Sequence, residues 1–228
     1  MSKAAEFDPV WEQKYGAGHA ERYPWDSVVS FVFRHAPRHK QRKDTRILEV
    51  GFGTGSNLWF AAREGFSVAG VEMSPSGVAY AKERFAAEGL AGDLRAGDFT
   101  RLPFADHHFD LVIDREALCC AGRNGMVKAI SEIHRVLRVG GRFFFNCYAD
   151  SHSSYRAGER GDDGLTVNIS GGSLVGCGQL QFISRSDIDL LFGKGWRLGA
   201  VERLESVDML QPAGMVHAEW KVVAEKLP

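Results

Sequence analysis

The 228-residue chain has no long uninterrupted apolar run, because charged residues break every candidate stretch. A membrane-spanning helix needs about 20 apolar residues, and no segment of this sequence supplies them. The chain also lacks the apolar core of a signal peptide, since Met1 to Glu6 lead into a polar segment. These two absences predict a protein of the cytoplasm with no membrane partner.

Net charge is almost absent as well. The 28 Lys and Arg residues nearly balance the 29 Asp and Glu residues, which gives a formal net charge of −1. General binding of nucleic acid depends on a cationic face that releases counterions. The basic run from Arg38 to Lys43 precedes the first predicted core strand, so it should lie at the edge opposite the active face. We therefore expect no nucleic-acid partner.

Cysteine is scarce and is not arranged for metal binding. The four cysteines are Cys119, Cys120, Cys147 and Cys177, and none of them forms a Cys-X-X-Cys pair. Adjacent cysteines seldom ligate one metal well, so we expect buried, reduced thiols that act as small apolar residues. No metal site is predicted.

What the sequence does contain is a regular alternation of short apolar strands and helical segments. The predicted core strands are residues 46–50, 67–72, 92–96, 109–114 and 141–148. This order predicts a doubly wound α/β fold with a parallel sheet covered on both faces. Two more strands, residues 197–209 and 215–225, are joined by a turn at residues 211–214 and predict an antiparallel hairpin at the sheet edge. The sheet should then have seven strands and be mostly parallel.

We expect a single domain over residues 1–228, made of four parts. These parts are an N-terminal helical lid and linker (1–43), a cofactor-binding core (44–148), a substrate-side insert (149–183) and a C-terminal helix and hairpin (184–228). In the first part, residues 8–15 and 27–35 are predicted helices, and Asp26 is the expected cap of the second. In the insert, residues 166–169 and 179–182 are expected to pair as strands.

The turn after the first strand carries the strongest signal. Gly51, Gly53 and Gly55 allow a tight turn and a close approach of the backbone to a ligand at a helix N-terminus. The spacing is not that of a dinucleotide-binding fold, whose third glycine would stand at position 56. Glu49 precedes the turn and could orient it or attract a cationic ligand. Glu72 ends the second strand, where a carboxylate accepts hydrogen bonds from two ribose hydroxyls.

From residue 46 to residue 148 the chain resembles the class I S-adenosylmethionine-dependent methyltransferases, in particular the small bacterial enzymes grouped as type 11. Five segments carry the resemblance in the expected order: Ile47–Gly55, Val71–Ser74, Ala96–Phe99, Leu102–Phe104 followed by Phe109–Val112, and His134–Gly141. The chain departs from the pattern at Val139, where the family usually has Pro, and at Phe52, where many members have Cys or Ala. The resemblance implies S-adenosyl-L-methionine as the cofactor.

It also implies which residues hold that cofactor. Asp98 should contact the adenine amino group, and Phe99 should pack on the adenine ring. Trp11 and Tyr15 should belong to an N-terminal helix that closes over the cofactor, or else to a helix that packs on the sheet edge. The other implied cofactor residues are Glu49, Gly51, Gly53, Gly55, Glu72, Met73, Ser74, Gly97 and Asp114.

On the acceptor side, Arg115 and Glu116 follow the fourth strand and should lie near the transferred methyl group, unless they are only a surface pair. His152 follows the fifth strand as a further catalytic candidate. His217 should lie at the same rim, with a structural role as the alternative. The expected substrate-binding residues are Tyr23, Tyr148, Tyr155 and Arg156. A general base matters if the acceptor is a hydroxyl and matters little for an amine.

The predicted activity is methyl transfer to an oxygen or nitrogen of a small-molecule acceptor. The segments 23–29 and 152–155 are similar to methyltransferases of bacterial surface-sugar pathways, which suggests a sugar-related acceptor. Methylation of a nucleic acid or protein is an alternative, although the Asn/Asp-Pro-Pro-Tyr/Phe motif of nucleic-acid amine methyltransferases is replaced here by residues 114–117. A non-catalytic, cofactor-binding partner subunit is another. The chain is expected to be a monomer or a homodimer.

Overall fold

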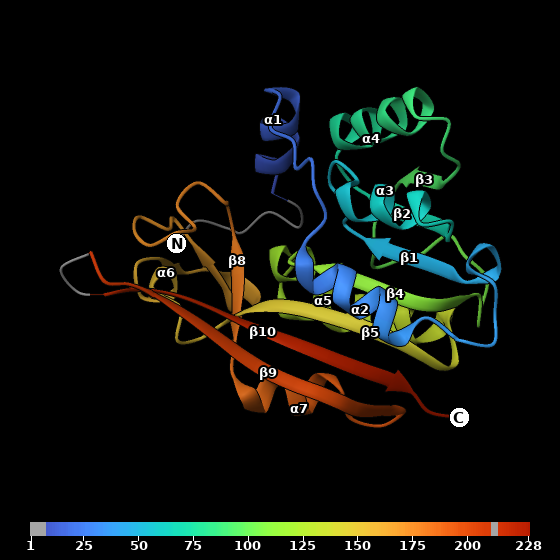
Figure 1. Cartoon of the computed structure of the whole chain (residues 1–228). Coiled ribbons are helices and arrows are strands. Elements are labelled where there is room, and N and C mark those ends of the chain that lie inside the picture. The colour runs from blue at the N-terminus through green and yellow to red at the C-terminus, as the bar shows by residue number, and fades with distance from the viewer. Residues whose placement is uncertain (1–7, 211–213) are drawn as a thin grey trace.

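The structure, a computed structural model, describes residues 8–210 and 214–228 of the chain. A twisted sheet runs through the centre of the molecule with helices on both sides (Figure 1). Its main strands are β1 (Arg46–Val50), β2 (Ser67–Glu72), β3 (Asp93–Ala96), β4 (Phe109–Arg115), β5 (Leu137–Ala149), β9 (Trp196–Asp208) and β10 (Met215–Lys226). The helices are α1 (Val10–Gly16), α2 (Asp26–His35), α3 (Ser56–Arg63), α4 (Pro75–Ala87), α5 (Arg123–Val136), α6 (Ser153–Arg156) and α7 (Arg185–Leu191).

The order of the main strands is β3-β2-β1-β4-β5-β10-β9, and β10 alone is antiparallel to its neighbours in this set. This confirms the predicted doubly wound α/β fold with a seven-stranded, mostly parallel sheet and a C-terminal antiparallel hairpin. The predicted turn of that hairpin falls mainly on residues 211–213, which lie outside the described residues. The parallel strands β1, β2, β4 and β5 end at one edge of the sheet, where ligands of such folds bind.

Residues alternate between the two faces of the central strands and so build two cores. Val112 and Phe143 pack with α5 on one face, while Leu111 and Phe144 pack with α2 and α3 on the other. Both faces are covered, which is why these strands read as continuous apolar runs. The sheet is therefore a rigid base for the loops at its carboxyl edge.

The insert adds three short strands beyond the seven. They are β6 (Glu159–Arg160), β7 (Leu165–Val167) and β8 (Leu180–Ile183). The expected pairing within the insert is present, since β7 and β8 are antiparallel. Strand β8 also pairs with the last two residues of β5, so the insert continues the sheet beside the carboxyl edge.

Two local predictions are wrong. Asp26 does not cap α2: it is the first helical residue, and Trp25 holds the cap position because its backbone N–H is bound 3.0 Å from the side-chain oxygen of Asn57. Strand β5 begins at Leu137 rather than at residue 141, because Leu137 pairs with Phe109 ahead of a register shift.

Among residues 8–210 and 214–228, no helix combines the length and apolar character needed to cross a bilayer.

Candidate active site

The glycine turn after β1 is held in a conformation that only glycine adopts readily. Gly51, Gly53 and Gly55 all have positive φ, at 65°, 56° and 78°. Space is also limiting, because a Cβ on Gly51 would lie 2.1 Å from Cβ of Ala117, and one on Gly53 would lie 2.6 Å from the hydroxyl oxygen of Tyr15. The turn is therefore packed between the loop after β4 and helix α1.

A cavity of about 310 Å³ opens beside this turn, at the carboxyl edge of the sheet. Its walls come from α1, the ends of β1, β2, β4 and β5, and the insert. The residues of the sequence prediction that line it are Trp11, Tyr15, Glu49, Gly51, Gly53, Glu72, Met73, Ser74, Phe99, Arg115, Glu116 and Tyr148. Segments up to 172 positions apart in the chain, from Asp8 to Leu180, thus meet around one space.

The remaining predicted cofactor residues are not among those that line the cavity. Gly55 is the N-cap residue of α3, and the backbone N–H of Gly97 donates to the carbonyl of Glu72. Asp98 accepts hydrogen bonds from the backbone N–H and the hydroxyl of Thr100, at 2.6 and 2.7 Å. Asp114 is fully buried, and burial raises its pKa to about 7 although two backbone N–H groups donate to it.

Three predicted substrate residues also lie away from the cavity wall. Tyr23 is 74% exposed and Arg156 is exposed too. Tyr155 packs on Phe182 with ring centroids 5.2 Å apart. The structure therefore brings the predicted cofactor residues together more completely than the predicted substrate residues.

Glu72 forms the floor of the cavity at the end of β2. Its two oxygens accept hydrogen bonds from the backbone N–H groups of Gly53 and Ser74, each at 2.8 Å. Burial raises the pKa of Glu72, and these N–H groups act against that rise. The carboxylate is thus fixed directly beneath the glycine turn, with its position set by backbone geometry.

Glu49 lies at the end of β1 and is 2% exposed. One of its oxygens accepts a hydrogen bond from the side-chain amide of Asn57 at 2.7 Å. The other, Oε2, has no hydrogen-bond partner within the described part of the chain. Burial raises the pKa of Glu49 to about 8. A buried carboxyl group that lacks a donor is costly, so this atom marks a place where a ligand would be stabilised.

Another part of the cavity wall is formed by the loop after β4. Glu116 has a left-handed backbone with φ of 58°, a conformation that is unusual outside glycine. Its carboxylate is paired with Arg115 and accepts a hydrogen bond from the hydroxyl of Tyr148 at 2.6 Å. Burial raises the pKa of Glu116, while the Arg115 guanidinium opposes that rise. The guanidinium in turn lies 3.8 Å from the ring centroid of Trp25.

Two predicted catalytic histidines meet just behind this wall. Nε2 of His152 lies 3.2 Å from Nδ1 of His217, and the hydroxyl oxygen of Ser173 lies within 3.3 Å of both atoms. His152 is fully buried, and burial lowers its pKa to about 4. His152 is the N-cap residue of α6 and His217 belongs to β10, so the pairing of His152 with His217 was not visible in the sequence.

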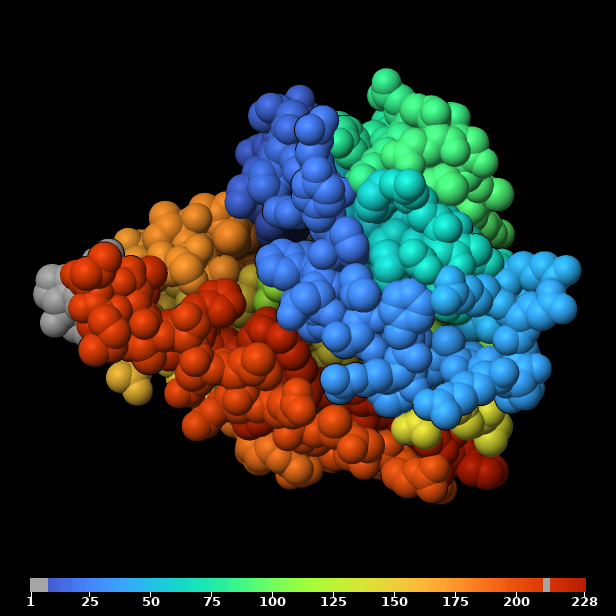
Figure 2. All heavy atoms as spheres, in the orientation of Figure 1, coloured from blue at the N-terminus to red at the C-terminus, as the bar shows by residue number. Residues whose placement is uncertain are grey.

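Helix α1 covers the cavity through contacts that the sequence did not reveal. The Glu12 carboxylate accepts hydrogen bonds from the hydroxyls of Ser74 and Ser76, the latter at 2.6 Å. Asp8 accepts from the backbone N–H of Gln179 at 2.9 Å. The blue N-terminal segment accordingly lies between the green region that contains α4 and the orange insert (Figure 2). The acidic and serine residues gave no period or motif from which this could be read.

The cysteines are free thiols, as expected. Cys119 and Cys147 are buried in the core, and burial raises the pKa of both thiols. Cys120 and Cys177 line the cavity. Because a raised pKa keeps a thiol protonated, these groups act as small apolar residues rather than nucleophiles.

Comparison with known proteins agrees with this architecture. Residues 48–145 match the family model described as a methyltransferase domain. A phthiotriol/phenolphthiotriol dimycocerosates methyltransferase of Mycobacterium leprae is 35% identical over 116 residues, which are 50% of this chain and 40% of that protein. The chain thus spans about two fifths of the length of the curated relatives it matches.

Solved structures show the same fold at lower identity. An S-adenosylmethionine-dependent methyltransferase from Methanosarcina mazei has a TM-score of 0.68 and 17% identity, covering 86% of this chain and 97% of that one. The [4+2]-cyclase SpnF has a TM-score of 0.66 and 20% identity, covering 92% of this chain and 85% of that one. At these identities the likeness establishes the fold alone.

The fold is that of the class I S-adenosylmethionine-dependent methyltransferases, and the glycine turn stands where the resemblance places it. The match of residues 48–145 to the methyltransferase-domain model confirms the resemblance found in the sequence.

Proposed function

We propose that the chain transfers the methyl group of S-adenosylmethionine to an oxygen or nitrogen of a small-molecule acceptor. One observation carries the proposal. The glycine turn and two buried carboxyl groups, Glu49 and Glu72, meet at one cavity, and one oxygen of Glu49 is left without a hydrogen-bond partner in the described chain. The reaction would be enzymatic, and a cytoplasmic location without a nucleic-acid partner remains part of the proposal.

The residues present fit this cofactor. The unpartnered Oε2 of Glu49 suits the α-ammonium group of the methionine part. Glu72, fixed by two backbone N–H groups, suits the ribose hydroxyls, and the apolar side chains of Met73 and Phe99 on the same wall suit the adenine ring. The close approach at Gly53 suits a ligand that lies against the backbone.

When bound, the cofactor supplies an electrophilic methyl group on a positively charged sulfur. The chain's own residues hold the nucleoside, exclude water and align the acceptor, and these effects can provide much of the rate. Glu116 lies on the part of the cavity wall that follows β4 and is held by Arg115 and Tyr148. Its carboxylate is positioned to take a proton from an acceptor hydroxyl.

The cavity is covered by α1, and this cover supports the proposal that the acceptor is a small molecule rather than a macromolecule. Helix α1 is tied to both α4 and the insert, and Trp25 lines the cavity next to Arg115. The mycobacterial relatives are named for phthiotriol and phenolphthiotriol dimycocerosates. Because the chain spans only part of those proteins, their names support methyl transfer but do not identify the acceptor. A sugar-related acceptor remains a prediction.

The test is a transfer assay with methyl-labelled S-adenosylmethionine. The full chain is incubated with the small-molecule fraction of a bacterial extract and, separately, with its protein and nucleic-acid fractions. We expect label in the small-molecule fraction, and none when Gly53→Val replaces the native chain. Label confined to protein or nucleic acid would favour a macromolecular acceptor. Binding of the cofactor without any transfer would favour a non-catalytic subunit.

A further inference from the structure

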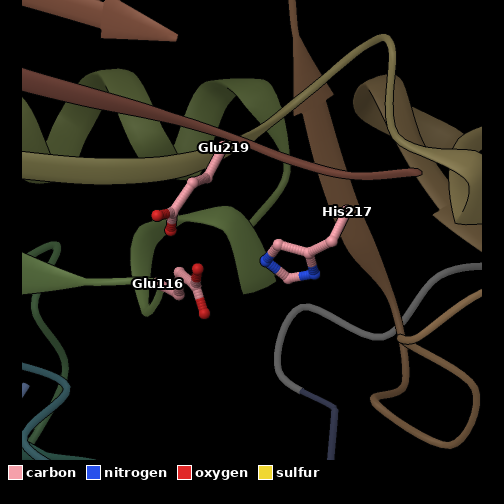
Figure 3. A group of neighbouring side chains, drawn as sticks. All are labelled: Glu116, His217 and Glu219. Carbon is pink, nitrogen blue, oxygen red and sulfur yellow. The ribbon is translucent and has the colours of Figure 1, made fainter. Parts of the chain in front are cut away.

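Three side chains converge beside the loop after β4, and none of them is among the predicted cofactor residues. His217 and Glu219 project from β10 toward the carboxylate of Glu116, which follows β4 (Figure 3). One ligand atom from each lies within 4.8 Å of the other two. Glu116 also lines the cofactor cavity, so this group of three, here called the triad, is next to the space where transfer is proposed.

One atom of the triad is in need of a donor. Oε1 of Glu116 is buried and has no hydrogen-bond partner within the described residues. The other oxygen, Oε2, is engaged by Tyr148 and Arg115. Glu219 is satisfied, since it accepts from Asn146 at 3.1 Å and pairs with Lys221 at 3.0 Å. Glu116 therefore offers one free acceptor atom at a fixed orientation.

The hydrogen bonds of His152 support an assignment of the proton on His217. The backbone N–H of Ser154 donates to Nδ1 of His152 at 3.0 Å, so that nitrogen is unprotonated. A neutral His152 then carries its proton on Nε2, which lies 3.2 Å from Nδ1 of His217. We assign this proton to a hydrogen bond with Nδ1 of His217, and a neutral His217 then carries its own proton on Nε2. That N–H faces the two carboxylates of the triad, because Nδ1 is already engaged by His152 and Ser173.

This protonation state argues against a metal ion. A ligating imidazole nitrogen must be unprotonated, and both carboxylates are already paired with cations, Arg115 and Lys221.

We infer that the triad is the acceptor subsite and that it takes a hydroxyl group, which accepts from Nε2–H of His217 and donates to Oε1 of Glu116. The inference rests on the proposed function and chooses oxygen over nitrogen as the methylated atom. A hydroxyl has both a proton to donate and a lone pair to accept. An ammonium group, the usual form of an aliphatic amine near neutral pH, has no lone pair for His217.

The chemistry of the step balances with the groups named. A lone pair of the hydroxyl oxygen forms the bond to the methyl carbon, the carbon–sulfur bond breaks, and its electron pair stays on sulfur as a neutral thioether. The hydroxyl proton passes to Oε1 of Glu116. His152 is a positioning residue, because it acts only by fixing the tautomer of His217. The hydroxyl of Ser173 lies within hydrogen-bond distance of both imidazole rings.

The tautomer can be tested without knowing the acceptor. The full chain is labelled with ¹⁵N-histidine, saturated with S-adenosylhomocysteine and studied by long-range ¹H–¹⁵N correlation. Variants His217→Asn and His152→Asn assign the two rings, and His39→Asn, at an exposed position, is the control. We expect Nε2 protonated and Nδ1 unprotonated in both rings. A proton on Nδ1 of His217, or a shift of its signals by one equivalent of Mn²⁺ or Zn²⁺, would overturn the inference.

The same labelled sample tests the preference for a hydroxyl. Methanol and methylammonium are added as the smallest probes of each chemistry, at equal molar concentrations. We expect methanol to move the Hε2 signal of His217 in the native chain and to lose this effect in Glu116→Gln. An effect of methylammonium alone, or no effect of methanol, contradicts the inference. Binding of S-adenosylhomocysteine in the same tube reports separately on the proposed function, since His217 and Glu219 do not line the cofactor cavity.

Discussion

Binding of S-adenosylhomocysteine should release a proton from Glu49. In the free chain burial raises the pKa of Glu49 to about 8, so at pH 7 about nine tenths of the molecules carry it in the neutral form. An ammonium group at the unpartnered Oε2 favours the carboxylate. Binding at pH 7 should therefore release up to about 0.9 proton per chain through this residue.

Calorimetry measures this release directly. The titration is repeated in buffers of different ionisation enthalpy, and the slope of the binding enthalpy against that quantity gives the number of protons. Glu49→Gln is the matched control, because its amide oxygen still accepts from Asn57. Asp114, with a pKa of about 7, can also change its protonation when the ligand binds. The proton release assigned to Glu49 is therefore the difference in release between the native chain and Glu49→Gln. Equal release by both proteins would refute the role given to Glu49.

The raised pKa of Glu49 should also make the free energy of unfolding of the free chain depend on pH in a defined direction. Because folding raises the pKa of Glu49, the folded chain binds more protons than the unfolded chain between about pH 4 and pH 8. Its free energy of unfolding should fall as pH rises through that window, by at most about 1.4 kcal/mol per pH unit from this residue. Denaturant unfolding at several pH values should show a shallower fall for Glu49→Gln. An equal slope of unfolding free energy against pH for the two proteins would contradict the raised pKa of Glu49.

Three further substitutions test the other walls of the cavity. Gly53→Val should abolish binding of S-adenosylhomocysteine and cost about 1–3 kcal/mol of stability, because residue 53 has positive φ and its Cβ would meet Tyr15; native-like affinity by calorimetry would contradict this. Glu72→Ala should weaken that binding by about 1–3 kcal/mol through the lost ribose contact, and unchanged affinity would count against its role. Glu12→Ala should speed release of S-adenosylhomocysteine in stopped-flow measurements with little change in unfolding temperature, because it unties α1 from Ser74; an unchanged release rate would remove the lid interpretation.

Most of the fold was predictable because it follows local patterns. The apolar runs of β1, β4 and β5 and the positive-φ glycines at positions 51, 53 and 55 are visible as residue types at fixed spacings. The insert pairing of β7 with β8 was also readable from short apolar segments. What failed were features set by a neighbour, such as the start of β5, where pairing with Phe109 extends the strand.

In the candidate site, too, the residues fixed by local pattern were predictable, and the contacts set by tertiary packing were not. The positions of Glu49 and Glu72 at the carboxyl edge of the sheet were predictable, since Glu49 is the penultimate residue of β1 and Glu72 is the last residue of β2. The contact of Glu12 with Ser74 and that of His152 with His217 join residues more than 60 positions apart. They depend on where α1 and α6 settle on the finished sheet, which leaves no period in the sequence. The protonation of His217 depends further on the backbone N–H of Ser154.

A crystal structure of the full chain with S-adenosylhomocysteine is the most direct test of the central claim. The account predicts the nucleoside against the turn at Gly53, with its ribose hydroxyls on Glu72 and its ammonium group on Oε2 of Glu49. A ligand found elsewhere on the chain, or one at this cavity that touches neither carboxyl group, would contradict it.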